Sequence, residues 1–346
     1  MAFWVVRAGR YGEREDVALE QNIVTGGWLA MPDLTNIQAK PDIERIFREA
    51  YPERSKIISN QVGQLWAFHD RIQTGDLIAL PLKKQPAIAI GTVSGPYTYR
   101  PDLPEDARHT RPVRWINKVL PRTAIDSDIR FSLGSSLTVF QVQRNDAEKR
   151  MRALISGKAP PTTHTPTTTL DTKEATGESV SDAMQDIEQY ARDQITEHIL
   201  RKFKGHGLAN LVSEILKTQG YYTHVSPVGA DGGVDIIAGR GPMGFDSPKL
   251  CIQVKSGQDP IDVKPLRELH GILKTFGADQ GLMVAWGGYK DTALKEARQH
   301  FFQLRLWTSQ ELVEALLENY HKLPPGMQND LPLKRIWALV PTETEA

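Results

Sequence analysis

A threonine- and proline-rich segment, residues 156–181, divides this chain of 346 residues into two parts. Almost none of its side chains is apolar, so ordering the segment would cost conformational entropy without burying apolar surface in return. We interpret it as a flexible linker; a glycosylated stalk is the alternative for such a composition. The segment predicts a first domain at residues 1–155, a second domain at 182–322 and a surface tail at 323–346.

The composition fits two globular domains. Hydrophobic residues make up 40% and charged residues 24% of the chain, which is enough apolar material for a sizeable core. Lys and Arg together number 42, as do Asp and Glu, so the chain is not a polycationic nucleic-acid coat, although a local basic cleft fits this balance. Cys251 is the one cysteine, which excludes an intramolecular disulfide and a cysteine-built zinc site.

We expect neither a membrane span nor a secretion signal in this chain. No apolar stretch reaches the ~18 residues that a membrane span requires. The first residues do not form a secretion signal, which also argues against a glycosylated stalk. We therefore expect a reducing, cytoplasmic setting and no membrane partner.

The first domain is predicted to be mostly β. Short apolar runs bounded by turn residues predict strands at residues 3–7, 22–28, 77–80, 87–93 and 137–142. One helix is predicted at Asp42–Ala50, with Pro41 at its start. Together these elements predict a small barrel with one or two helices.

The second domain has a different pattern. A charged helix is predicted at residues 182–204, and apolar residues at helical spacing predict an amphipathic helix from Leu208 to Leu216. Predicted strands lie at residues 221–226, 234–238, 250–255, 281–286 and 304–307, and further helices at 263–276, 291–302 and 309–320. This alternation predicts an α/β fold, a mixed sheet with helices on both faces.

Polar side chains interrupt two of these apolar strands. Asp235 lies among valine and isoleucine, while Gln253 and Lys255 lie in the next strand. Side chains two apart in a strand point to the same face, with α-carbons ~6–7 Å apart. A charged lysine in an apolar run is costly unless it meets an opposite charge. We therefore predict that Asp235, Gln253 and Lys255 share one site.

A magnesium ion fits the oxygen atoms of this predicted site. Mg²⁺ usually takes one or two carboxylates, completed by water and phosphate oxygens. Asp235 would supply a carboxylate and Gln253 a side-chain carbonyl oxygen, and Mn²⁺ is expected to substitute. Lys255 would orient the attacking water and stabilise charge in the transition state. The alternatives are a buried Asp235–Lys255 ion pair without catalysis and a hydrogen-bonded core amide at Gln253.

Together these residues resemble the catalytic domain of Mrr-type restriction endonucleases, in the PD-(D/E)XK nuclease superfamily. The resemblance covers about residues 205–320, and its motifs are Gly220-Tyr221, the Asp-Gly-Gly-Val-Asp run that ends at Asp235, Gln253-Val254-Lys255 and Leu306-Trp307. It implies a restriction-endonuclease-like fold. It also implies that Asp235 binds metal, that Gln253 is the second metal-site residue and that Lys255 is the catalytic lysine.

One position departs from the family. Its members often carry a Phe-Glu pair early in the helix before Gly-Tyr, and that glutamate assists at the metal. Leu208 and Ala209 occupy the matching positions here. Glu214, farther along this helix, is one candidate helper, with a solvent-facing role as its alternative. Asp231 is the second candidate; its alternative is a turn residue before two glycines.

Aromatic residues are frequent between the strands of the first domain. Its strands and the Gly-Pro-Tyr-Thr-Tyr run resemble the EVE/PUA-like fold over about residues 1–152. That resemblance implies a nucleic-acid reader, in some relatives of a modified base, because an aromatic cage restores the stacking that a flipped-out base loses. Trp28 is the favoured stacking residue, with core packing as its alternative. Four arginines predict a phosphate-contacting loop or a solvated one: Arg100, Arg108, Arg111 and Arg114.

The sequence thus predicts a magnesium-dependent DNA endonuclease of restriction type, directed to modified (methylated) DNA in a defence role. One alternative is a nucleic-acid-binding protein whose nuclease-like domain is inactive. Another is an RNA-directed nuclease. Because each chain has one predicted active site, cutting both strands favours a homodimer.

Overall fold

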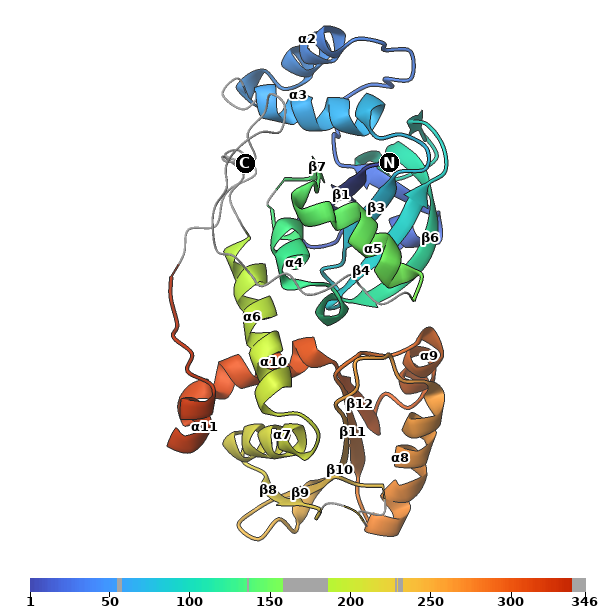
Figure 1. The fold of residues 1–346 in the computed structure, drawn as a ribbon. Coiled ribbons are helices and arrows are strands. Elements are labelled where there is room, and N and C mark those ends of the chain that lie inside the picture. The colour runs from blue at the N-terminus through green and yellow to red at the C-terminus, as the bar shows by residue number, and fades with distance from the viewer. Residues whose placement is uncertain (55–57, 136, 158–185, 228, 230–232, 338–346) are drawn as a thin grey trace. The chain divides into compact units, whose positions relative to one another are not determined.

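The computed structural model describes residues 1–54, 58–135, 137–157, 186–227, 229 and 233–337 (Figure 1). They form two compact units, Met1–Tyr190 and Ala191–Trp337. Most of the predicted linker, residues 156–181, lies outside the described residues, so its limits stay a prediction. Within the described ranges, no helix combines the length and apolar character needed to cross a bilayer.

The first unit is built on a curled seven-stranded sheet (Figure 1). Its order is β2-β6-β4-β3-β1-β7, and β5 pairs with β6. β1 and β3 are parallel, and the other pairs are antiparallel. The strands are β1 (Phe3–Val6), β2 (Ile23–Gly26), β3 (Leu77–Pro81), β4 (Ala87–Val93), β5 (Thr98–Tyr99), β6 (His109–Pro121) and β7 (Val139–Gln141).

Five helices accompany this sheet in the described part of the unit, so the prediction of one or two is wrong. They are α1 (Glu15–Glu20), α2 (Lys40–Ala50), α3 (Ile58–Trp66), α4 (Ser127–Leu133) and α5 (Ala147–Ile155). The predicted helix at residues 42–50 is α2, with Pro41 in its first turn. The other four have only 6 to 9 residues, too few to show a repeated apolar face in the sequence.

The first unit includes residues up to Tyr190. The carboxylate of Asp186 accepts a hydrogen bond of 2.9 Å from Lys83 Nζ, and it lies 3.9 Å from the guanidinium of Arg7. The rings of Phe131 and Tyr190 meet edge to face, with their centroids 5.5 Å apart. Residues 186–190 therefore pack as part of the first unit.

The second unit is a five-stranded mixed sheet in the order β12-β11-β10-β9-β8. The strands are β8 (Tyr222–Val225), β9 (Ile236–Arg240), β10 (Asp246–Lys255), β11 (Gln280–Ala285) and β12 (Leu304–Trp307). Helices α7 (His206–Thr218) and α10 (Ser309–Asn319) lie on one side of this sheet, and α8 (Val263–Phe276) and α9 (Asp291–Gln299) on the other (Figure 1). The remaining helices are α6 (Ile187–Lys202) and α11 (Pro325–Asp330). The predicted mixed sheet with helices on both faces is confirmed.

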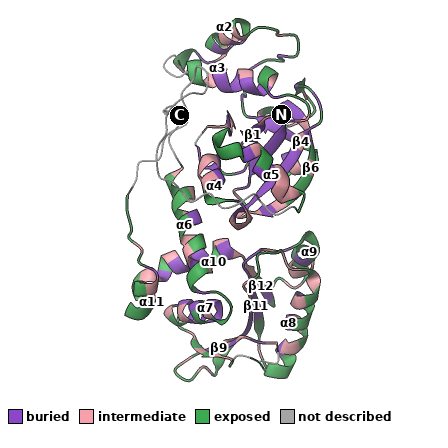
Figure 2. Ribbon diagram, viewed as in Figure 1, coloured by how far each residue is buried: buried purple, intermediate pink, exposed green. Residues whose placement is uncertain are grey.

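Alternating side chains of β10 fill two separate cores, one on each face of the sheet. Ile252 packs into the cluster that contains the apolar face of α7. Cys251 packs into the other cluster, against Leu266 and Leu269 of α8. The middle of the sheet is accordingly buried, while the outer faces of the helices are exposed (Figure 2). Gln253 and Lys255, in phase with Cys251, project on the α8 side.

Candidate active site

Asp235 stands where the regular pairing of β9 with β10 ends. The two strands are antiparallel, with Ile236 opposite Ile252, and Asp235 directly precedes β9 rather than lying within it. Its amide donates to the carbonyl of Ile252 at 2.9 Å. Its carboxylate Oδ2 accepts a hydrogen bond of 2.6 Å from the backbone amide of Val254 in β10. The carboxylate is therefore fixed beside the backbone that joins Gln253 to Lys255.

The side-chain oxygen of Gln253 is buried. The residue is 8% exposed, and its Oε1 has no hydrogen-bond partner in the described part of the chain. A buried acceptor without a donor costs about 1–3 kcal/mol, and such atoms in native proteins usually meet a water or an ion. The alternative of a hydrogen-bonded core amide does not account for this oxygen.

Lys255 is the last residue of β10, opposite Ala285 of β11. Its carbonyl accepts a hydrogen bond of 2.8 Å from the amide of Trp286, which closes this end of the ladder. Lys255 is half-buried. Among the described residues, no ion pair joins it to Asp235 within 4.0 Å. The ion-pair alternative therefore finds no support, and the ammonium group is available to an anionic ligand.

The structure describes one of the two candidate helpers, Glu214, and does not bring it to this site. Glu214 lies on α7, where its Oε1 pairs with Lys217 Nζ at 2.7 Å. No hydrogen bond or ion pair joins Glu214 to Asp235 or Gln253 across the described ranges. Asp231 lies outside the described residues. Leu208 and Ala209, at the positions of the family's Phe-Glu pair, are buried in the core.

The oxygen atoms at the site fit magnesium better than zinc. No group of three His, Cys, Asp or Glu side chains that could hold a metal ion occurs among the described residues. Structural zinc sites need four such ligands, and catalytic ones three. One carboxylate from Asp235 and the unpartnered oxygen of Gln253 match the few protein ligands that Mg²⁺ takes when water and phosphate complete its shell.

In the first unit, Trp28 is 6% exposed. Its ring centroid lies 5.5 Å from that of Phe68 and 6.1 Å from that of His109. A hydrogen bond of 2.7 Å joins Tyr97 Oη to His109 Nδ1, and burial lowers the pKa of His109 to about 4, so this imidazole is neutral near pH 7. A base can stack on Trp28 only if these rings shift, and the stacking role stays a prediction.

Three of the four arginines predicted to contact phosphate are engaged elsewhere. Arg111 is 3% exposed and donates to the backbone carbonyls of Phe68 and His69. Arg100 pairs with Asp102 at 2.6 Å. Arg108 lies 3.9 Å from Glu105 and donates to the carbonyl of Leu103 at 3.4 Å. Arg114 is exposed, and its guanidinium makes no ion pair or hydrogen bond within the described part of the chain, so it alone of the four is available to a phosphate.

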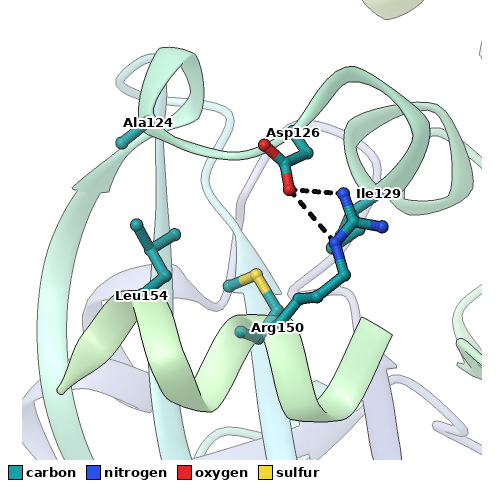
Figure 3. Close-up of a pocket in the computed structure, with 6 residues that line it drawn as sticks. Ala124, Asp126, Ile129, Arg150 and Leu154 are labelled. Carbon is teal, nitrogen blue, oxygen red and sulfur yellow. Dashed lines mark hydrogen bonds and ion pairs between the residues drawn. The ribbon is translucent and has the colours of Figure 1, made fainter. Parts of the chain in front are cut away.

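A pocket in the first unit is too small for a nucleotide (Figure 3). It encloses about 20 Å³, room for about one water molecule. Arg150, which lines it, forms ion pairs with Asp126 and with Asp128. Burial by itself would raise the pKa of Asp128, but the hydrogen bonds from Arg150 outweigh it and lower this pKa to about 2. The ion pairs of Arg150 with Asp126 and Asp128 thus stabilise the fold, and we assign no ligand to this pocket.

Residues 200–316 match the Mrr catalytic family, described as a restriction endonuclease. The matched range contains Asp235, Gln253 and Lys255, together with all five strands of the second sheet. The predicted resemblance to Mrr-type restriction endonucleases is confirmed. The domain defines the class: a DNA endonuclease, which hydrolyses phosphodiester bonds.

Residues 4–141 match a family described as a domain of unknown function. The match covers almost all of the curled sheet of the first unit. It lends no support to the EVE/PUA-like resemblance, which is not confirmed.

Three solved structures are distantly similar to the chain. The DNA modification-dependent restriction endonuclease AspBHI is 14% identical with a TM-score of 0.32, covering 79% of this chain and 73% of that chain. The MspJI restriction endonuclease in complex with a 27-mer oligonucleotide is 14% identical with a TM-score of 0.32. The match covers 80% of this chain and 68% of that chain. A protein of unknown function is 19% identical with a TM-score of 0.24, covering 31% and 58%. These TM-scores do not establish a shared fold, and no curated protein matches the chain.

Proposed function

We propose that this chain is a Mg²⁺-dependent DNA endonuclease of restriction type, with Asp235, Gln253 and Lys255 as its active site. The observation that carries the proposal is the buried Oε1 of Gln253, which has no hydrogen-bond partner among the described residues. Gln253 directly precedes Val254, whose backbone amide holds the Asp235 carboxylate, and these residues lie inside the match to a restriction endonuclease domain. An unpaired buried oxygen is costly to the free protein, and a bound cation would remove that cost.

Each residue has a separate role in this proposal. Asp235 and Gln253 would each give one oxygen to the ion, and the amide of Val254 prevents the Asp235 carboxylate from rotating away. Mg²⁺ bound there would polarise a phosphoryl oxygen of the DNA. Lys255 would orient the attacking water and offset the negative charge that develops on the phosphate. Mn²⁺ should replace Mg²⁺, because it also accepts oxygen ligands in octahedral geometry.

We also propose that the first unit binds DNA and directs cutting to modified, methylated bases. Its aromatic cluster around Trp28 would give a base a π-face to stack on once the rings of Phe68 and His109 shift. The guanidinium of Arg114 is exposed and available to a backbone phosphate.

Methylated and unmethylated plasmids, incubated with Mg²⁺, Mn²⁺ or EDTA, test this function. The parent protein should cut the methylated plasmid with either metal and not in EDTA. Asp235→Ala should fold, bind DNA and fail to cut, because the site loses its carboxylate. Cutting at the parent rate by Asp235→Ala would exclude the proposed site, and equal cutting of both plasmids would exclude the preference for modified DNA.

A second candidate function is nucleic-acid binding without cleavage. It is favoured by the ion pair of Glu214 with Lys217, which engages the one acid of α7 in a surface pair. A protein of this kind would shift methylated duplexes in a gel and leave them intact in both metals. Duplex RNA in the same assays tests the RNA-directed alternative, and sedimentation with and without DNA tests the proposed homodimer.

A further inference from the structure

Two loops meet where the parallel strands β10 and β11 end. Residues 256–262 follow Lys255, and residues 286–290 follow β11. The amide of Ile261 donates to the carbonyl of Gly288 at 3.0 Å, and the amide of Lys290 donates to the carbonyl of Ile261 at 3.0 Å. Lys290 Nζ also lies 3.2 Å from Asp262 Oδ2. The loop that leaves Lys255 is therefore held against the loop that leaves β11.

Gly287 makes this close approach sterically feasible. A Cβ atom at residue 287 would lie 2.6 Å from the carbonyl oxygen of Asp259, and closer still to that of Gln258. Side-chain carbon atoms do not approach oxygen this closely, and backbone carbonyls cannot rotate aside as a flexible side chain can. The backbone of Gly287 is not in the left-handed region, so the requirement for glycine is one of space. Gly257, in the facing loop, has no atom within 4 Å of a Cβ built on it.

The contact lies three residues beyond Lys255 along the chain. The carbonyl of Lys255 is bonded to the amide of Trp286, the residue directly before Gly287. Lys255 is thus anchored by its own carbonyl on one side and by the packed loop on the other. A side chain at residue 287 would push the loop outward at Gln258 and Asp259 and turn the end of β10 that carries the ammonium group.

We propose that Gly287 is a positioning residue for Lys255. By letting the two loops touch, it fixes the direction in which the Lys255 side chain leaves β10. The inference rests on the proposed endonuclease function, in which Lys255 acts at the transition state while Asp235 and Gln253 hold the ion. A displaced Lys255 should therefore slow cleavage and leave metal and DNA binding unchanged.

Gly287→Ala in the full-length protein tests this role, with Gly257→Ala as the matched control. Single-turnover cleavage of methylated duplex is measured over a range of Mg²⁺ and DNA concentrations, beside thermal unfolding. Gly287→Ala should cut on the order of 100-fold more slowly, the loss typical of a displacement of about 1 Å at an active site. Its half-saturating Mg²⁺ and DNA concentrations should match the parent's, and Gly257→Ala should cut like the parent.

Cleavage by Gly287→Ala at the parent rate would overturn the inference. So would an equal loss of cleavage and Mg²⁺ affinity, because that pattern means a general collapse of the site. If the variant does not fold, Lys290→Met decides, since it removes the ion pair between the loops without a clash. It should slow cleavage about two- to fivefold, and an unchanged rate overturns the inference. A parent protein that cuts no DNA would instead disprove the proposed function.

Discussion

Replacing Gln253 by leucine should make the protein more stable and inactive at the same time. The side chain is 8% exposed and its Oε1 has no partner in the described structure, so the free protein bears the cost of an unsatisfied acceptor, about 1–3 kcal/mol. Leucine has a similar volume and no polar atom. Gln253→Leu should therefore raise the free energy of unfolding by about 1–3 kcal/mol, or about 3 °C in Tm for each kcal/mol.

Thermal unfolding in EDTA measures the stability, and single-turnover cleavage with Mg²⁺ measures the activity. The matched variant is Gln253→Glu, which keeps the oxygen and adds a charge near Asp235. Burial and repulsion should make it less stable than the parent in EDTA, and Mg²⁺ should raise its Tm by more than it raises the parent's. Cleavage should be retained.

Two results would refute this reasoning. A Gln253→Leu protein less stable than the parent in EDTA would mean that the amide is hydrogen-bonded in the core. A Gln253→Leu protein that cuts as fast as the parent would mean that Gln253 does not hold the ion. A carboxylate would then have to take the place of Gln253 beside Asp235, with Asp231 and Glu214 as the candidates from the sequence.

Three further predictions concern single residues. Lys255→Ala should bind Mg²⁺ with the parent's affinity in a calorimetric titration and lose cleavage, because its role is at the transition state; a joint loss of both would make it a structural residue. Asp128→Asn should lower the free energy of unfolding by about 1–2 kcal/mol at pH 7. Because the pKa of Asp128 is lowered to about 2 by the bonds from Arg150, this difference should persist above about pH 4 and disappear as the pH falls towards 2, which denaturant unfolding at several pH values can check. Trp28→Ala should cost about 3–5 kcal/mol of stability, as expected for a buried tryptophan, and a melting temperature equal to the parent's would mean that the ring is exposed to a ligand instead.

Helix α8 was predictable to the residue because local signals mark both of its ends. The side chain of Asp262 accepts the amide of Val263 at the start of α8, and Gly277, with φ 60°, ends the helix. Strand β6 was missed. Three successive residues of this strand, 116–118, are all exposed. The alternation that identifies a half-buried strand is therefore absent there. The strands β1, β3 and β4, by contrast, are buried on both faces, and their continuous apolar runs made them predictable.

The candidate site was predictable in the same partial way. Spacing alone places Gln253 and Lys255 on one face of a strand, and the structure agrees. The bond from the Val254 amide to the Asp235 carboxylate depends on where the pairing of two strands ends, and no spacing within the chain encodes that. The need for glycine at residue 287 arises from a contact with residues about 30 positions earlier. Such a contact exists only once the sheet has formed.

The packing of Asp186 has a consequence for anyone who recombines these two units. Partial burial of Arg7 lowers its pKa to about 10, while the negative charge of Asp186 works in the opposite direction. A chimaera that takes the first unit only as far as residue 155 would leave this guanidinium, and Lys83, without their shared carboxylate. The portable module therefore runs to Tyr190, and a foreign nuclease grafted onto it should be spliced after the first turn of α6.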